Sequence, residues 1–245
     1  MKIEAAKLSC PGSRDVNEDY ICMDYDEKNG IFILADGLGG HGMGDIASKL
    51  AAETAMEVLL SGKAIEEAFE SAEEAVMRKQ EAEGEPDKMK TTLCILVIRD
   101  GKASAGHIGD SRVYFFKNRK YVKRTPDHSV PQMLYESGDI KEEEIRFHAD
   151  RNRLLKVIGV EWDEPQYEID GTLIISTGGL FHRRIPDAFV LCSDGWWELV
   201  TEKEMMKALE VSDSPRSWLE EMKRVIEEKG AGTEMDNYSA VAVFV

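Results

Sequence analysis

Short apolar runs alternate with turn residues along most of this 245-residue chain, and they predict strands. The runs are rich in β-branched and aromatic residues, which favours sheets buried on at least one face. The predicted strands are Ile3–Ser9, Tyr20–Asp24, Ile31–Ala35, Thr91–Arg99, Lys102–Ile108, Val113–Phe116, Tyr121–Lys123, Leu173–Ser176, Phe189–Ser193 and Ser239–Val245. Asp100-Gly101 between two of them has the composition of a hairpin turn.

Helical spacing occurs in two pairs of segments. The first pair begins with a helix at Asp45–Leu60, on which Ile46, Leu50, Thr54 and Val58 recur on one face, which we expect to be buried. The second helix of this pair starts at Ile65 and ends at Gly84-Glu85-Pro86. The second pair starts at Thr201 and at Ser214-Pro215, which have the residue types of helix caps. Residues 125–160 are mixed and polar, with short helical pieces at Val130–Ser137 and Glu142–His148, and they predict an inserted lobe. Strands and helices in this order predict helices packed on antiparallel sheets rather than βαβ units.

Composition narrows the class of protein. The length suits one large domain, and no apolar stretch approaches the length of a membrane-spanning helix. Residues 1–4 begin no signal-peptide pattern, so we expect a cytoplasmic protein that does not bind membranes. The net charge of −16 argues against nucleic acid as a partner. The cysteines (Cys10, Cys22, Cys94 and Cys192) show no zinc-ligand spacing, and Cys94 and Cys192 are expected to be buried within strands.

Five short acidic motifs stand where apolar runs begin or end. They are Asn17-Glu18-Asp19, Asp36-Gly37, Gly109-Asp110-Ser111-Arg112, Ser193-Asp194-Gly195 and Asp236-Asn237. Carboxylates gathered at strand ends repel one another unless cations lie between them. Because oxygen ligands suit hard cations, the motifs predict a cage for two or more Mg²⁺ or Mn²⁺ ions rather than for zinc. Taken singly, each motif also fits a turn or a cap.

The segment after the third predicted strand fits a second class of site. Gly37, Gly39 and Gly42 satisfy G-x-G-x-x-G between a strand and a helix, which is the dinucleotide-binding pattern. Asp36 would repel a pyrophosphate, however, and the helix is followed by another helix where that pattern requires a strand. A nicotinamide oxidoreductase is therefore the remote alternative, and a flexible strand-to-helix turn is the purely structural one.

Taken in order, these motifs resemble those of a known family. Ser13–Asp19, Asp36–His41, Gly109–Arg112, Cys192–Glu198 and Asp236–Ser239 look like the motifs of the metal-dependent PPM-family (type 2C) Ser/Thr protein phosphatases. Thr125–Ser129 and His148–Asn152 resemble the flap-lobe segments of bacterial members. The resemblance implies an α+β fold, a four-layer α-β-β-α sandwich with the metal site at one end between two antiparallel sheets. It also implies one catalytic domain, residues 1–245, with a flap lobe at about 125–160.

The resemblance assigns metal ligands residue by residue. Asp36, Asp194 and Asp236 would be the catalytic carboxylates that hold two central ions, with Asp36 bridging them and the Gly37 carbonyl joining the second ion. Asp110 together with Asp194 would match a third, weaker site. The implied reaction is hydrolysis of phosphoserine and phosphothreonine by a metal-bridging water, for which two nearby divalent ions are suited.

Other roles come from the same resemblance. Arg14 would bind the substrate phosphate, and Glu18 and Asp19 would orient metal-bound waters. Leu38 follows the Asp-Gly pair where some members have a histidine, so the proton donor to the leaving group stays open between His41, a metal-bound water and no specific group. We expect phosphoprotein substrates made by a Ser/Thr kinase, and a monomer. The alternative is a catalytically silent module that binds phosphoproteins.

Overall fold

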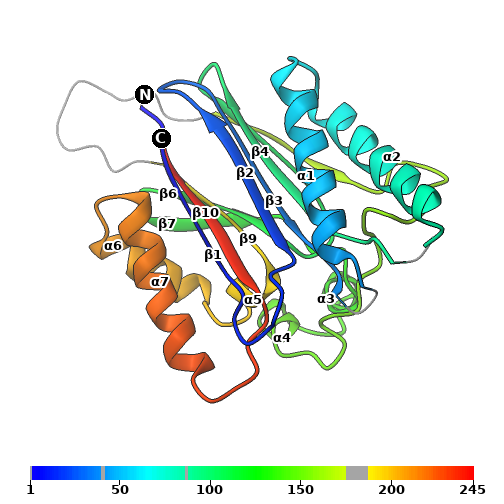
Figure 1. The fold of residues 1–245 in the computed structure, drawn as a ribbon. Helices are drawn as coiled ribbons and strands as arrows, with labels where there is room; N and C mark the ends of the chain where they lie inside the picture. Colours follow the sequence, from blue (N-terminus) through cyan, green and yellow to red (C-terminus); the bar gives the residue numbers. More distant parts are fainter. Residues whose placement is uncertain (1, 40–41, 86–87, 175–186) are drawn as a thin grey trace.

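The computed structural model describes residues 2–39, 42–85, 88–174 and 187–245 (Figure 1). In these residues two antiparallel five-stranded sheets are present, ordered β1-β10-β9-β6-β7 and β2-β3-β4-β5-β8. Their strands are β1 (Glu4–Cys10), β2 (Asp19–Tyr25), β3 (Gly30–Asp36), β4 (Leu93–Arg99), β5 (Lys102–Ile108), β6 (Arg112–Lys117), β7 (Lys120–Arg124), β8 (Glu168–Ile174), β9 (Ala188–Cys192) and β10 (Tyr238–Phe244). The predicted strands are therefore confirmed within about two residues at most ends, although Ile175 and Ser176 lie outside the described residues.

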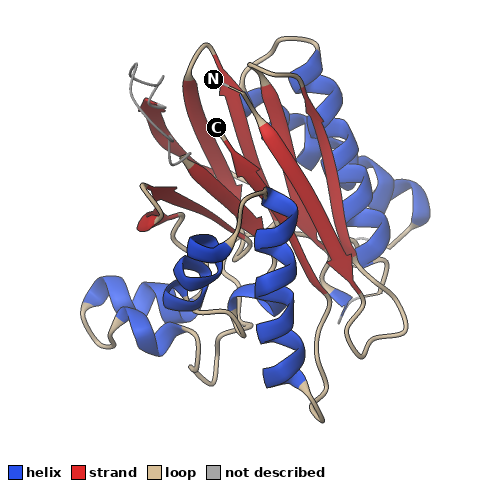
Figure 2. Ribbon diagram, turned by 90° about the vertical axis from the view of Figure 1, so that its left-hand side faces the viewer, coloured by secondary structure: helices blue, strands red, loops and turns tan. Residues whose placement is uncertain are grey.

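The helices lie outside the paired sheets (Figure 2). Their bounds are α1 (Gly44–Leu60), α2 (Ile65–Glu83), α3 (Val130–Ser137), α4 (Glu142–Ile145), α5 (Asp194–Trp197), α6 (Glu202–Val211) and α7 (Pro215–Gly230). The α1–α2 pair covers the sheet that contains β3, and the α6–α7 pair covers the sheet that contains β10 (Figure 1). The four-layer sandwich expected from the sequence is confirmed.

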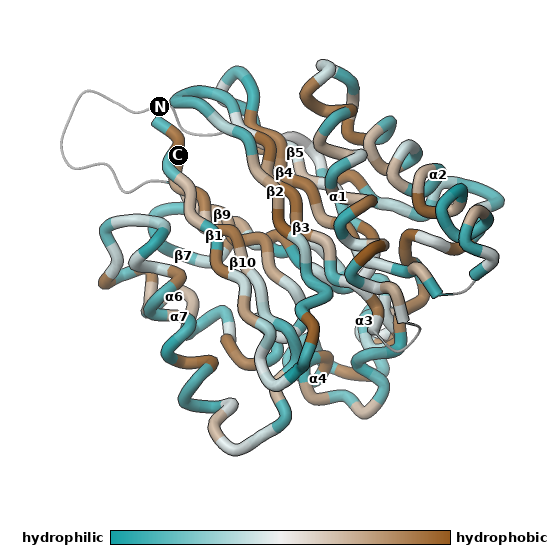
Figure 3. Tube along the Cα trace, in the orientation of Figure 1, coloured by the Kyte–Doolittle hydropathy of each residue, from teal (hydrophilic) through white to brown (hydrophobic). Residues whose placement is uncertain are grey.

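Three apolar cores correspond to the three interfaces between four layers. One lies under α1 and α2, a second under α5–α7, and a third between the sheets, where Phe32, Cys94 and Leu191 are fully buried. The strands are accordingly the most hydrophobic part of the trace (Figure 3). Cys192 is also fully buried, so the expectation for both strand cysteines is confirmed.

The buried face of α1 differs from the predicted stripe. Ile46 is 36% exposed, whereas Ala47, Ala51 and Ala55 are completely buried. Small alanine side chains let the helix approach the sheet closely. The prediction from hydropathy favoured the larger, more hydrophobic isoleucine and therefore selected the wrong face. The prediction for α4 was also too long, since this helix ends at Ile145 rather than His148.

No helix within the described residues combines the length and the apolar character needed to cross a membrane.

Candidate metal and phosphate site

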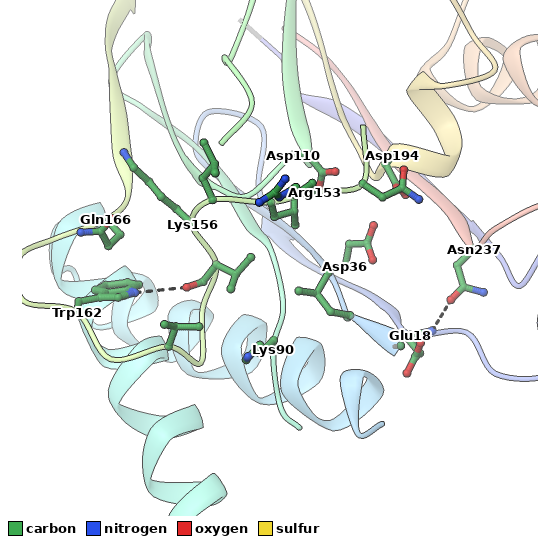
Figure 4. A pocket seen from close by; sticks show the side chains of 18 of the residues that line it. Glu18, Asp36, Lys90, Asp110, Arg153, Lys156, Trp162, Gln166, Asp194 and Asn237 are labelled. Atoms are coloured by element: carbon green, nitrogen blue, oxygen red, sulfur yellow. Dashed lines mark hydrogen bonds between the residues drawn. The ribbon is translucent and has the colours of Figure 1, made fainter. Parts of the chain in front are cut away.

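Carboxylates from both sheets meet at one end of the sandwich. Asp19, at the start of β2, is paired in register with Asp36 at the end of β3. Asp194 is the first residue of α5 directly after β9, and Asp236 lies just before β10. Asp110 occupies the tight connection between β5 and β6. Figure 4 shows Asp36, Asp110 and Asp194 side by side at the cavity.

Burial and mutual repulsion make the carboxyl groups of Asp36, Asp110 and Asp194 resist ionisation. Burial, followed by the charges of Asp19, Asp194, Asp110 and Asp236, raises the pKa of Asp36 well above its usual range. Burial and nearby acids raise the pKa of Asp194 to about 7, and burial and the nearby Asp194 raise that of Asp110 strongly. This is the electrostatic state expected of a carboxylate cage without cations, and an all-oxygen set of this kind fits Mg²⁺ or Mn²⁺.

Asp19 bridges the two sheets beneath this cluster. Its Oδ2 accepts a hydrogen bond of 2.9 Å from the Ser193 hydroxyl, while its Oδ1 has no hydrogen-bond partner among the described residues. Burial raises its pKa to about 6. A buried oxygen without a partner is costly, and water or a cation's hydration shell would satisfy it.

The Arg14 guanidinium meets Asp236 directly. Its Nη2 donates a 2.9 Å hydrogen bond to Asp236 Oδ2, and the other oxygen of Asp236 accepts from the Asn237 amide at 2.8 Å. The carboxylate of Asp236 raises the pKa of Arg14 further. Both side chains are largely exposed, so this ion pair is weak and exchangeable. A cation that takes Asp236 would free Arg14 for a phosphate.

Asn237 fastens the loop that carries Arg14. Its side-chain amide donates to the carbonyls of Pro11 (2.9 Å) and Val16 (3.0 Å), and its Oδ1 accepts from the Glu18 amide (2.8 Å). The acidic motif was visible in the sequence, but this clamp depends on contacts across more than two hundred residues and was not predicted.

The glycines after β3 serve close packing around Glu18. A Cβ on Gly39 would lie 1.9 Å from Glu18 Oε2, and one on Gly37 would lie 2.2 Å from the Gly44 carbonyl oxygen. The amide of Gly37 donates to the Glu18 carbonyl and that of Leu38 to Lys90, so these amides do not form a pyrophosphate cradle. Because α1 leads into α2 rather than a strand, the dinucleotide alternative is wrong. His41 lies outside the described residues.

Thr91 and Thr92 hold the backbone of Asp36. Thr92 Oγ1 accepts from the Asp36 amide at 3.0 Å, and Thr91 Oγ1 donates to the Asp36 carbonyl at 2.8 Å. Thr91 also forms isolated bridges to Gly37 and to Ile158. The end of the segment 152–158 is thereby tied to the strand that presents Asp36.

A buried ion pair supports Asp110 from behind. Arg112 makes two hydrogen bonds to the Asp127 carboxylate, at 2.7 and 2.6 Å, and its guanidinium lies 3.5 Å from the ring centroid of Trp197. The Trp197 indole N–H in turn donates to the Asp110 carbonyl at 2.9 Å. Arg112 in the Gly-Asp-Ser-Arg motif therefore positions Asp110 through Trp197, and its own guanidinium is engaged by Asp127.

A separate histidine cluster brings together ligand-type atoms from β5, from β8 and from the loop between β7 and α3. His107, His128 and Glu168 have such atoms within 4.8 Å of one another. The two imidazoles are stacked, however, with centroids 4.7 Å apart and planes 20° apart. Lone pairs lie in the ring plane, so nearly parallel rings do not direct them at one ion. His128 instead accepts from the Gly109 amide and lies 3.0 Å from Glu168.

An open cavity of about 980 Å³ extends from the carboxylates toward residues 152–166. Besides Arg14, its walls include three further cations, Lys90, Arg153 and Lys156, together with Trp162 (Figure 4). No pattern in the sequence indicated these contributions, because they come from segments that only the fold brings together.

Paired antiparallel sheets with a cage of buried carboxylates at one end define a metal-dependent hydrolase, and comparison with known proteins agrees. The family model described as "Protein phosphatase 2C" matches residues 9–238. The protein phosphatase PhpP of Streptococcus pneumoniae is 32% identical over 215 residues, which are 82% of this chain and 81% of that protein. The chain belongs to the protein phosphatase 2C family.

Solved structures agree in fold. The serine/threonine phosphatase PstP/Ppp of Mycobacterium tuberculosis superposes with a TM-score of 0.80 at 25% identity, covering 100% of this chain and 99% of that one. A PstP catalytic domain solved with two manganese ions gives a TM-score of 0.79 at 24% identity, covering 99% and 98%. The prediction of a PPM-family enzyme is confirmed, and the manganese ions of that PstP structure belong to the class of ion predicted from the acidic motifs.

Proposed function

We propose that this chain hydrolyses phosphoserine and phosphothreonine in proteins at the cavity lined by Asp36, Asp110 and Asp194. The convergence of buried carboxylates with raised pKa values carries the proposal, because such a cluster is stable only when cations or protons neutralise it. Asp36, Asp194, Asp236 and the Gly37 carbonyl would hold the two central ions, and Asp110 with Asp194 the third.

Bound Mg²⁺ or Mn²⁺ supplies charge neutralisation and an activated water for displacement at phosphorus. The protein's own contribution is to place the reacting groups. Arg14 offers a planar pair of donors to phosphate oxygens, which a lysine would not reproduce. Glu18 and Asp19 would accept hydrogen bonds from metal-bound water, and the lack of a hydrogen-bond partner for Asp19 Oδ1 among the described residues supports this role.

The setting of the reaction is part of the same proposal. The substrates are phosphoproteins produced by a Ser/Thr kinase of the same cell, and the enzyme acts as a cytoplasmic monomer that engages neither membranes nor nucleic acid. Two bound divalent ions would bring the net charge from −16 to −12, so the surface stays acidic and disfavours polyanions.

Phosphate release tests the proposal. Wild-type protein, Asp36→Asn and Asp194→Asn are compared on an aryl phosphate and on a phosphothreonine peptide, with Mn²⁺ and then with a chelator. We expect release by the wild type with Mn²⁺ only, and a loss of at least about a hundredfold in each variant. A protein that binds the phosphopeptide but releases no phosphate would instead be the silent binding module, and activity that survives chelation would refute the metal site.

A further inference from the structure

Cations line the cavity beside the metal-site carboxylates, although the chain as a whole is strongly acidic. Arg153 and Lys156 come from the segment after α4, and Lys90 lies on the other side of the cavity (Figure 4). Lys156 pairs with Glu168 at 3.5 Å. Arg153 is exposed, and no ion pair to it is found among the described residues. Its charge therefore lies at the cavity, and no other residue of the described part of the chain pairs with it.

The backbone at Arg153 is fixed on both sides. Its amide donates to the Asp150 carbonyl at 2.9 Å, and its carbonyl accepts from the Val130 amide at 3.0 Å. The adjacent Leu154 forms an isolated bridge with Ser129. An exposed side chain on a doubly hydrogen-bonded backbone holds its charge in a defined place, which lowers the entropic cost of using it in binding.

The same hydrogen-bond ladder continues to the metal site. Leu155 donates to the His128 carbonyl at 2.8 Å, and His128 donates its own amide to the Gly109 carbonyl at 2.8 Å. The Gly109 amide returns a hydrogen bond to His128 Nδ1 at 3.2 Å. Gly109 directly precedes Asp110 in the sequence. The position of Arg153 is therefore set relative to the carboxylates where phosphate would bind.

We propose that Arg153 selects substrates by pairing with a carboxylate side chain that flanks the phosphorylated residue. The inference rests on the proposed function. Arg14 already faces the carboxylate cluster through Asp236, so it is the cation placed for the phosphate itself. Arg153 lies on the cavity wall between that cluster and Lys156 in Figure 4, where a neighbouring residue of the substrate would pass. A guanidinium recognises a carboxylate through two parallel hydrogen bonds.

The selectivity should depend on position. Glu161, Asp163 and Glu164 line the same cavity beside Trp162, so its walls are not uniformly cationic. A carboxylate is therefore favoured only where the substrate passes Arg153, and acidity elsewhere in the peptide brings no gain. Leu155 and Val160, which are 52% and 43% exposed, offer apolar contact to the stem of the same substrate side chain.

Peptide kinetics test the inference. Phosphothreonine peptides carry a single Asp, or the isosteric Asn, at each flanking position in turn. At one position we expect the wild type to show a kcat/KM about threefold to fivefold higher for Asp than for Asn at low salt, the range of a good exposed ion pair. Arg153→Ala should reduce that ratio to about one, Arg153→Glu should invert it, and Arg153→Lys should restore part of it.

Two controls separate this effect from others. Lys141→Ala removes an exposed cation of the same region that does not line the cavity, and it should leave the ratio unchanged. Hydrolysis of an aryl phosphate should be the same in Arg153→Ala and wild type. An unchanged Asp/Asn ratio in Arg153→Ala overturns the inference. An equal loss on all peptides and on the aryl phosphate overturns it too, because Arg153 would then bind the phosphate itself. If the wild type releases phosphate from no peptide, the proposed function fails first.

Discussion

Replacing the buried Glu73 by glutamine should remove a pH-dependent penalty on stability. Glu73 lies on the inner face of α2, where it is 8% exposed. Its Oε2 accepts a 2.7 Å hydrogen bond from the Gly159 amide, and its Oε1 has no partner among the described residues. Gln80, two turns further along the same face of α2, donates to the carbonyls of Met89 and Gly159 at 2.7 and 2.9 Å. Together they fasten the chain just after Ile158, which is bridged to Thr91.

The magnitude follows from the ionisation of Glu73. Burial, only partly offset by backbone hydrogen bonds, raises its pKa from 4.5 to about 7. That rise corresponds to at most about 3 kcal/mol, and partial screening by solvent reduces the expected effect to about 1–2 kcal/mol. Between these two pKa values the native carboxyl holds a proton that the unfolded chain has released. The native state is therefore favoured as pH falls through 7 toward 4.5, and it carries the full penalty above 7.

Urea denaturation in the presence of chelator measures this effect. The pKa values of Asp19 and Asp194 are raised to about 6 and about 7, so the observable is the difference in stability between Glu73→Gln and wild type. We expect the variant to be more stable by about 1–2 kcal/mol at pH of about 8.5, with the difference vanishing near a pH of about 5. Glu74→Gln is the matched control, because Glu74 is an exposed neighbour paired with Arg78. A difference that is independent of pH, or a variant that is less stable at high pH, would show that ionisation of the buried Glu73 does not destabilise the fold.

Three further predictions concern the site. Arg14→Ala should raise KM for a phosphothreonine peptide more than it lowers kcat, and steady-state kinetics that show the reverse would assign Arg14 to the transition state. Asn237→Ala leaves the Glu18 amide and two carbonyls without their partner, so the free energy of unfolding should fall by about 1–3 kcal/mol in urea titrations. An unchanged midpoint would mean that these hydrogen bonds do not hold the loop. Asp127→Asn leaves the buried charge of Arg112 without its counter-charge, so the free energy of unfolding should fall by about 3–5 kcal/mol in the same urea titrations. A fall within experimental error would mean that this ion pair does not support Asp110.

Periodicity and turn chemistry were enough to predict most of the fold. Strands in the centre of a sheet are continuous apolar runs. The starts of the helices at Thr201 and Ser214 were predicted from their capping residues, and the structure contains both caps. The four-residue helix α5 was missed, because Asp194-Gly195 at its start has the composition of a turn. Local sequence also could not show which face of the alanine-rich α1 is buried.

The site was predictable only in its acidic motifs. Aspartates at strand ends are visible in a sequence, and their order along the chain carried the resemblance to a family. Glu73 and Gln80 are of residue types normally found at the surface, and their burial is explained only by the loop at Gly159, which lies 79 residues from Gln80. The placement of Arg153 likewise depends on a ladder through His128, which no spacing reveals.

Anomalous diffraction from crystals grown with Mn²⁺ would locate the bound ions independently of any activity assay. We expect difference peaks bounded by the carboxylates of Asp36, Asp194 and Asp236, with Arg14 released from Asp236. Peaks confined to other parts of the molecule, with no ion at these three carboxylates, would show that they do not form a metal site.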